Sequence, residues 1–269
     1  MTFVHPRRLA TVTLAALCLA ATGFASPLRT ATDDPAAAWQ EARQMVVVTV
    51  PEWQSTQGTL RTYRRQAHGD WHPVDPPRPV VIGKGGAGWG LGLQPPQHDG
   101  PVKQEGDGRS PAGVFHIGIA FGYAPHADTG LSYHGMTASD WCVDVSGSPH
   151  YNRIVDADAA GKDAVKGATE PMRRDIHVHG DQRYRQGFVI ESNWQQQPMA
   201  GSCVFGHLWK SSDTSTTGCT AMAPATMGHL LAWLDADKHP VMVLLPESAY
   251  ATVRATWKLP VLDTEQTGP

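Results

Sequence analysis

The chain has little charge, little excess of either sign and few cysteines. Only 17% of its 269 residues are charged, and the formal net charge is −3. Binding to nucleic-acid phosphates needs clustered lysines and arginines, which this composition does not supply. The densest basic run, Arg61–Arg65, holds three arginines but also Tyr63, a pattern typical of a solvated strand face. We therefore expect no nucleic-acid partner.

Long hydrophobic runs are also missing after the first 25 residues. The apolar stretch Leu9–Ala21 follows two arginines, and it is shorter and more interrupted than the ~20 apolar residues of a membrane-spanning helix. Small residues at Gly23 and Ala25 suit cleavage by a signal peptidase. We interpret residues 1–25 as a signal peptide removed on export to the periplasm or cell envelope; an uncleaved anchor is the alternative. No later segment is expected to cross a membrane.

Cysteine is scarce, and its count restricts the disulfides. Cys18 belongs to the predicted signal peptide, so three cysteines remain after cleavage: Cys142, Cys203 and Cys219. An odd number in an oxidising compartment leaves one free thiol or an intermolecular bridge. The economical interpretation joins Cys142 to Cys203 and leaves Cys219 free. Three unpaired thiols are the alternative, and a bridge that used Cys219 would remove any chemistry at that residue.

Glycine and proline are plentiful, with 27 and 21 residues, whereas helical periodicity is rare. This composition, with low charge, is typical of a loop-rich β protein. Residues 26–44 are rich in Ala, Thr, Asp and Pro and are predicted to form a flexible linker. Strands are expected at residues 45–50, 58–66, 79–83, 113–118, 187–193, 202–209 and 240–245.

One segment carries a clear helical pattern. Pro224 suits the first turn of a helix, and apolar residues follow it at positions 227, 230, 231 and 234. A shorter helix is expected after the last strand, ending near Trp257. We therefore predict a mainly β domain over residues 45–246, followed by a C-terminal extension, residues 247–269, that contains a short helix.

His207 and Cys219 form the most informative pair in the chain. They lie twelve positions apart, joined by a polar loop that can connect neighbouring elements. A cysteine attacks as thiolate, and a neighbouring imidazolium can lower the thiol pKa from its usual ~8.5. Gly218 permits a backbone that exposes amide groups to a developing oxyanion, worth roughly 3 kcal/mol per donor. The pair predicts a nucleophile and its base, with Asp213 or a backbone carbonyl orienting the histidine.

The neighbours of this pair are candidates for substrate contacts. In the predicted strand 202–209, a period of two places Cys203, Phe205, His207 and Trp209 on one face. Phe205 and Trp209 would then form core or groove walls. We assign possible substrate-binding roles to Ser202, Thr217 and Trp209.

Three stretches resemble the catalytic domain of the YkuD-type L,D-transpeptidases, over residues of about 46 to 246. The first is similar to the family's Ser/Thr-Pro-x-Gly-x-Phe segment, the second to a branch found in exported Gram-negative proteins, and the third to its active-site histidine and Ser/Thr-x-Gly-Cys segment. Thr217 stands where the commoner motif has histidine. The stretches are Lys103–Phe115, Trp141–Asp144 with Tyr151 and Asn152, and Gly201–His207 with Thr217–Cys219.

The resemblance implies a β-sandwich or barrel-like catalytic domain with a few short helices. It also implies that Cys219 carries the acyl group, that His207 is the base, and that amides around Gly218 form the oxyanion hole. The substrates would be peptidoglycan stem peptides, and no cofactor would be needed. An amine acceptor would give a 3→3 cross-link, whereas water would give carboxypeptidase trimming.

Two other functions are compatible with the sequence. His177 and His179 could share a strand face and, with His207, ligate a zinc ion in a hydrolase. Alternatively, the protein could bind the cell wall without turnover. Sensitivity to a chelator or to iodoacetamide, and acylation by a carbapenem-like probe, would distinguish these hypotheses.

Overall fold

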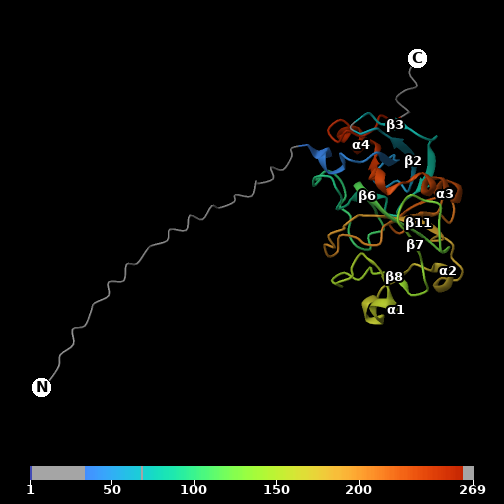
Figure 1. Ribbon diagram of the computed structural model, residues 1–269. Helices are drawn as coiled ribbons and strands as arrows, with labels where there is room; N and C mark the ends of the chain where they lie inside the picture. Colours follow the sequence, from blue (N-terminus) through green and yellow to red (C-terminus); the bar gives the residue numbers. More distant parts are fainter. Residues whose placement is uncertain (2–33, 68, 263–269) are drawn as a thin grey trace, which may run out of the picture. The chain divides into compact units, whose positions relative to one another are not determined.

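Eight strands close into a barrel in the computed structural model of this chain (Figure 1). Their order is β1–β14–β6–β11–β12–β13–β4–β2, and β2 pairs back onto β1 in antiparallel fashion. The mainly β class predicted from the sequence is therefore confirmed. The structure describes Met1 and residues 34–67 and 69–262, so the predicted signal peptide lies outside the described region apart from Met1.

The barrel strands differ greatly in length, and shorter strands extend the sheet or form a second one, β10–β8–β9. The strands are β1 Gln44–Val50, β2 Gln57–Arg64, β3 His72–Pro73, β4 Arg78–Val81, β5 Ala87–Trp89, β6 Ser110–Gly122, β7 Tyr133–Gly135, β8 Asp140–Cys142, β9 Ile154–Asp156, β10 Glu170–Pro171, β11 Gln186–Ile190, β12 Phe205–Leu208, β13 Thr220–Met222 and β14 Val241–Pro246.

Helices are short and lie before, between or after the strands. Figure 1 places α4 and β3 at one end of the domain, and α1 and β8 at the other. The α-helices are α1 Ala157–Ala160, α2 Arg174–His177, α3 Pro224–Trp233 and α4 Glu247–Val253, and the 3-10 helices are η1 Pro35–Trp39, η2 Lys162–Val165 and η3 Ala236–Lys238. The predicted helix that begins at Pro224 is thus confirmed.

The β-branched run at the start of the domain forms a strand that is buried on both faces. Every residue of β1 is buried, and β1 pairs in parallel with the fully buried β14. Parallel strands covered on both faces read as continuous hydrophobic runs rather than alternating ones. The runs at Met45–Val50 and Val241–Leu245 have this character, which explains why both were recognisable in the sequence.

Part of the predicted linker is folded. In η1, Trp39 is only 2% exposed, and its ring meets that of Trp257 with centroids 5.8 Å apart. The Asp34 carboxylate caps η1 by accepting a hydrogen bond from the Ala36 amide. Residues 34–44 are therefore a folded part of the domain, and the linker prediction is wrong there. The remaining linker residues, 26–33, lie outside the described region.

The C-terminal extension also packs onto the barrel. Tyr250 of α4, Trp257 and Leu259 are buried in the same apolar cluster as the strands. The Tyr250 hydroxyl donates to the Pro260 carbonyl at 2.8 Å, which fixes the segment after the helix. The compact domain therefore runs at both ends beyond the predicted limits of residues 45–246.

Two apolar clusters fill the domain. The large cluster draws on β1, β6, β14, α3 and α4, and residues such as Val46, Val48 and Leu244 are at most 1% exposed. The small cluster gathers seven buried residues around the strands that carry the predicted nucleophile. They are Phe121, Met136, Cys142, Met172, Tyr184, Phe205 and Cys219.

A disulfide joins Cys142 of β8 to Cys203, across 61 positions of sequence, and leaves Cys219 as a buried free cysteine. The economical interpretation of the cysteine count is thereby confirmed. Cys203 itself has φ +54°, a left-handed conformation that a strand does not contain. As a consequence β12 begins only at Phe205, and the strand predicted over residues 202–209 is shorter than expected.

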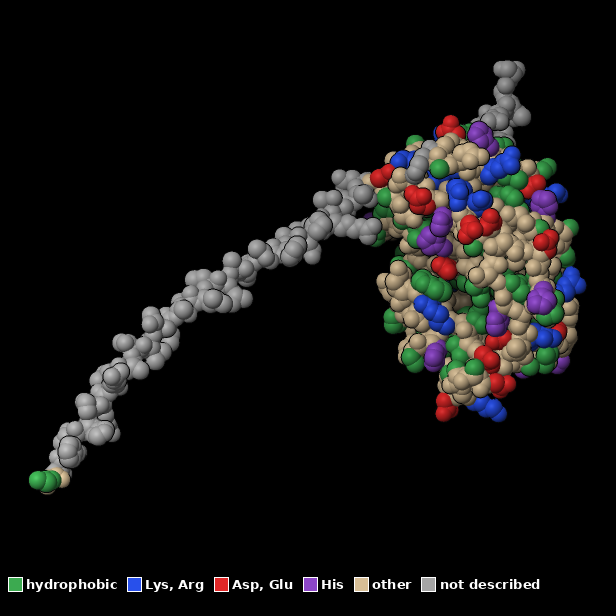
Figure 2. Space-filling model, in the orientation of Figure 1, with side chains coloured by type: hydrophobic (Ala, Val, Ile, Leu, Met, Phe, Trp, Pro, Cys, Tyr) green, Lys and Arg blue, Asp and Glu red, His purple; other side chains and the backbone are tan. Residues whose placement is uncertain are grey.

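The surface carries charges of both signs. On the face drawn in Figure 2, acidic and basic side chains are interspersed rather than gathered into one field. Among the residues that the structure describes, no helix is both long and apolar enough to span a bilayer.

Candidate active site

Cys219 and His207 come from neighbouring segments and line one cavity. β12 pairs in parallel with β13, and the register sets His207 opposite Ala221, two residues after Cys219. Cys219 itself lies in the bend just before β13, and both side chains line the same cavity. The cavity that they share has a volume of about 500 Å³. The structure thus brings the predicted nucleophile and base together.

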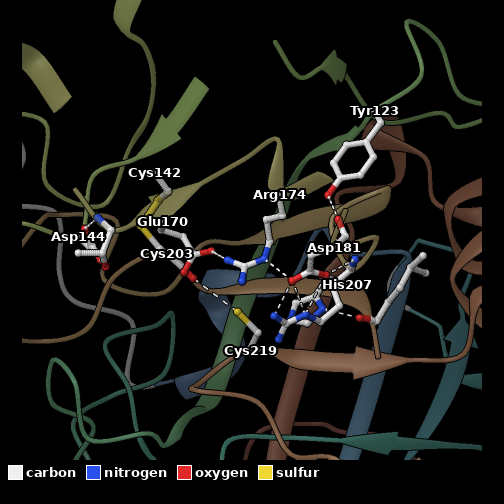
Figure 3. Close-up of polar contacts among 12 residues, drawn as sticks. Tyr123, Cys142, Asp144, Glu170, Arg174, Asp181, Cys203, His207 and Cys219 are labelled. Atoms are coloured by element: carbon white, nitrogen blue, oxygen red, sulfur yellow. Dashed lines mark hydrogen bonds and ion pairs between the residues drawn. A yellow bond between two sulfur atoms is a disulfide. The ribbon is translucent and has the colours of Figure 1, made fainter. Parts of the chain in front are cut away.

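The Cys219 thiol is buried and protonated. The residue is 6% exposed, and its Sγ donates to the carbonyl oxygen of Cys203 at 3.6 Å (Figure 3). Burial, followed by the negative charge of Glu170, raises the pKa of the Cys219 thiol to about 12. At neutral pH the residue is therefore a thiol rather than a thiolate.

His207 is neutral and held by the backbone. It is 4% exposed, and its Nδ1 lies 2.8 Å from the Leu208 carbonyl oxygen. A carbonyl can only accept, so Nδ1 carries the proton and Nε2 is left as a base. Burial lowers the pKa of His207 to about 4, partly offset by the Leu208 hydrogen bond. A carbonyl orients the imidazole, whereas Asp213 is exposed and bonded to Ser211.

The cavity is thus lined at rest by a neutral thiol and a neutral imidazole. We expected an imidazolium that lowers the thiol pKa, and the structure shows the opposite shifts in both residues. The physical reason is burial, which disfavours the charged form of each group. Neither residue therefore carries a charge at rest.

The backbone of Gly218 and Cys219 is fixed by hydrogen bonds. The Cys219 carbonyl accepts hydrogen bonds from Ser110 Oγ at 3.0 Å and Thr216 Oγ1 at 2.6 Å. Gly218 has φ +152°, and its amide donates to Thr216 Oγ1 at 3.1 Å. The amide that we assigned to an oxyanion hole is therefore occupied by Thr216 in this conformation. It would have to leave that oxygen to bind substrate.

The three stretches of the family resemblance meet around this cavity. Ser110, from the first, bonds the Cys219 carbonyl. Asn152, from the second, accepts a hydrogen bond from the Cys203 amide at 2.9 Å. Glu105 accepts hydrogen bonds from the hydroxyls of Tyr151 and Ser202, the latter at 2.8 Å. Segments separated by about a hundred residues thus support one site.

A chain of ion pairs borders the cavity on the side of His207 (Figure 3). Arg174 binds Glu170 at 2.8 Å and Asp181 at 2.9 Å, and Arg183 binds Asp181 at 2.6 Å. Burial alone would raise the pKa of Asp181, but hydrogen bonds from Arg183 and Arg174 hold it well below its usual value. The pKa of Glu170 is instead raised, because burial outweighs the attraction of Arg174.

Sequence reasoning missed Glu170, Arg174, Arg183 and Tyr184 as site residues. All four line the cavity with Cys219 and His207. One local signal was available, because Glu170 and Arg174 stand four positions apart, the spacing of a helical ion pair. Nothing local marks Tyr184.

Two of the three predicted substrate contacts lie at the cavity. Ser202 and Thr217 line it, whereas Trp209 lines a separate hollow together with His179 and Lys210. The strand β12 ends before Trp209, whose amide donates to the Met222 carbonyl at 2.9 Å. Trp209 therefore does not line the cavity of Cys219 and His207, and its role in substrate binding stays a prediction.

The histidines of the zinc alternative do not converge. His177 belongs to α2 rather than to a strand, and its Nε2 lies 2.8 Å from the Ala138 carbonyl oxygen. Its ring packs against that of Trp141 in a tilted arrangement, with the centroids 5.2 Å apart. His179 faces the hollow of Trp209, away from His207. Within residues 34–67 and 69–262, no three His, Cys, Asp or Glu side chains are grouped so as to hold a metal ion. The expected three-histidine ligand set is therefore not formed.

Comparison with known proteins returns no relative. No family model, no curated protein and no solved structure matches this chain.

Proposed function

We propose that this protein is an exported cysteine L,D-transpeptidase of the YkuD type that acts on peptidoglycan stem peptides. One observation carries the proposal: a free thiol, Cys219, and a neutral imidazole, His207, line the same polar cavity. The resemblance of the surrounding motifs gives the substrate class. Export to the periplasm or cell envelope is part of this proposal and rests on the sequence of residues 1–25.

Acylation would begin when Nε2 of His207 takes the Cys219 proton as the sulfur attacks a peptide carbonyl carbon. The new C–S bond forms while the carbonyl π electrons move to oxygen. In the second half of the step, the C–N bond to D-alanine breaks, and the proton on Nε2 passes to the leaving amine. The product is a thioester between Cys219 and the diaminopimelate carbonyl of the stem.

Deacylation would reverse these roles. His207 removes a proton from an incoming amine or water, which attacks the thioester carbonyl. The C–S bond breaks as the proton on Nε2 passes to the leaving Cys219 sulfur, which restores the thiol and the neutral imidazole. An amine from a second stem yields a cross-link, and water yields a trimmed tripeptide. The buried, neutral resting pair suits both steps, because neither requires a standing charge on either residue.

The charges of the cavity suit a zwitterionic peptide. Lys84 and Arg183 lie on its lining as cations, whereas Glu105 and Asp144 contribute carboxylates. A stem that ends in diaminopimelate and D-alanine offers ammonium and carboxylate groups to such a lining. A volume of about 500 Å³ is within the range of small-ligand sites.

The decisive experiment is incubation of the purified protein with disaccharide tetrapeptide. We expect intact-protein mass spectrometry to show an acyl adduct on Cys219 and chromatography to show loss of D-alanine. Cys219→Ala should abolish both and keep the native circular dichroism spectrum. A Cys219→Ala protein that still turns over the tetrapeptide would refute the proposal. Binding of sacculi by the wild type with no adduct would favour the non-catalytic wall-binding alternative.

A further inference from the structure

A second hollow, of about 460 Å³, adjoins the catalytic cavity, and no step of the mechanism above uses it. The two spaces share one lining residue, Arg183. At the end of β12, His207 lines the catalytic cavity, and the next residue, Leu208, lines the hollow. A ligand in the hollow would therefore lie beside the reacting groups.

Main-chain hydrogen bonds fix the walls of the hollow. The Leu208 amide donates to the Arg183 carbonyl at 3.0 Å, which ties the loop before β11 to β12. Within that loop, the Asp181 amide donates to the Val178 carbonyl at 3.0 Å. The hollow is thus formed before a ligand arrives, which lowers the entropic cost of binding.

Positive charge is in excess on the lining of the hollow. Among the described residues, four basic side chains and one carboxylate line it: Arg183, Arg185, Lys210, His179 and Asp181. The carboxylate is already bound by Arg183 at 2.6 Å and, from the side of the catalytic cavity, by Arg174 at 2.9 Å (Figure 3). The other basic groups are therefore not neutralised by it.

Three of these cations have hydrogen-bond donors to spare. Arg183 binds Asp181 through Nε and Nη2, and within residues 34–67 and 69–262 its Nη1 has no acceptor. In the same part of the chain, the side chains of Arg185 and Lys210 make no hydrogen bond or ion pair, and both residues are exposed. Guanidinium and ammonium donors of this kind bind carboxylates through charge-assisted hydrogen bonds.

Another part of the lining is apolar. Trp209 is half-buried and lines the hollow together with Leu208 and Pro224. An indole ring offers a large apolar surface for the hydrocarbon of a ligand. A small inorganic anion would leave this surface uncovered. The lining as a whole suits a peptide that carries both carboxylates and hydrocarbon.

We propose that this hollow binds the second, acceptor stem peptide and selects stems whose carboxylates are free rather than amidated. The inference deepens the proposed function and rests on it. The covalent step is the deacylation described above. A C–N bond forms between the acceptor amine and the thioester carbonyl, the C–S bond breaks, and the amine proton passes through Nε2 of His207 to the Cys219 sulfur. Binding beside the cavity gives the amine an advantage over water.

The test removes charge from both partners. The protein variant is Arg185→Gln with Lys210→Gln. The acceptors are the stem tripeptide, which has no D-alanine to lose, and the same tripeptide with carboxamides in place of its carboxylates. Disaccharide tetrapeptide is the donor, and chromatography measures the ratio of cross-linked to trimmed product.

The two acceptors should respond differently. With the carboxylate tripeptide, the double variant should lower the ratio about 10-fold, since it loses two partly exposed charge-assisted contacts. With the carboxamide tripeptide, the wild type and the variant should give the same low ratio. Added sodium chloride should lower the ratio more in the wild type than in the variant, because salt screens these contacts.

The matched control is Arg64→Gln with Lys162→Gln. It removes the same two charges from exposed residues that line neither the cavity nor the hollow, and it should keep the wild-type ratio. A general loosening of the site would lower the ratio equally with both tripeptides and leave its salt dependence unchanged. That result, or an unchanged ratio in the natively folded Arg185 and Lys210 variant, would overturn the proposal.

Failure of this inference is distinguishable from failure of the proposed function. If the wild type forms the Cys219 thioester but gives only trimmed product with the carboxylate tripeptide, the proposed function stands and the acceptor site is refuted. If the wild type does not react with tetrapeptide, the proposed function fails, and calorimetric titration with the carboxylate tripeptide decides the rest. Tighter binding by the wild type than by the variant keeps the hollow as a site for carboxylate-bearing peptides, whereas equal or absent binding refutes it.

Discussion

The large and small apolar clusters bury their residues equally well, yet burial has different consequences in the two. In the large cluster, side chains such as Val48 and Leu244 bury hydrocarbon, and each buried side chain stabilises the fold by about 1.5–3 kcal/mol. In the small cluster, the Cys219 thiol and Tyr184 are buried, and the buried His207 packs against Tyr184. In the small cluster, burial therefore changes the pKa values of ionisable side chains.

The difference indicates that two parts of the barrel have different roles. β1 and β14 supply a stable frame, whereas β12 and the segment before β13 hold groups whose charged forms the interior disfavours. The small cluster has only seven buried members, so it depends more on a covalent link for its order. Each prediction below challenges one side of this comparison.

The largest stability effect is expected from the disulfide. Cys142→Ser with Cys203→Ser opens a loop closed across 61 positions, which the chain-entropy relation values at about 4 kcal/mol. Urea unfolding of the double variant should show this loss in the free energy of unfolding. The small cluster would be released first, because the bridge joins one of its members, Cys142, to Cys203, which packs against it.

The matched control lies in the large cluster. Leu244→Ala should cost about 2–5 kcal/mol, through lost burial and a cavity. Alkylation of Cys219 should then keep its native rate in the folded protein, whereas loss of the disulfide should change it. A changed alkylation rate in folded Leu244→Ala would show that the clusters are not independent.

The next effect is a pH dependence of stability that comes from His207. Its folded pKa is about 4, below the 6.5 of an unperturbed histidine, so the unfolded chain binds the proton more tightly. The contribution is fully present above about pH 6.5 and is lost as the pH falls toward 4. We expect a loss of about 2 kcal/mol between pH 7.5 and pH 5 from this residue.

His207→Gln isolates that contribution from the carboxylates that titrate in the same range. Urea unfolding at pH 7.5, 6 and 5 should give a shallower decline for the variant than for the wild type. Parallel curves for the two proteins would mean that His207 is not buried in its neutral form, and the assignment of its Nε2 as a base would lose its support.

Much of the frame could be predicted from local sequence. The strand near Met45 and the strand that ends the barrel are continuous apolar runs, and the helix at Pro224 has both a start signal and a period of 3.6. The disulfide followed from counting cysteines. The strands and the helix depend on a few adjacent residues, and the disulfide on the number of cysteines, so none of them requires knowledge of the fold.

The site was only half predictable, because its other half is assembled from distant segments. Glu170, Tyr184 and Cys219 belong to three segments, β10, the loop before β11 and the loop before β13, and no local pattern links them. Likewise, the local sequence around Trp39 is typical of a linker. Its burial depends on Trp257, 218 positions later, which packs against it. The pKa values of Cys219 and His207 depend on that assembly, so spacing suggested the pair but gave the wrong charge state.

The smallest effect is expected for an ion pair at the rim of the large cluster. His229 Nε2 lies 3.0 Å from Asp75 Oδ2 in a hollow lined by Leu60, Leu230 and Trp233, and the histidine side chain is 63% exposed. Solvent and salt screen such a pair, so Asp75→Asn should change the free energy of unfolding by less than about 1 kcal/mol. A double-mutant cycle with His229→Gln measures the coupling. A coupling above about 2 kcal/mol would mean that electrostatic interactions are as important at this rim as we expect them to be only in the small cluster.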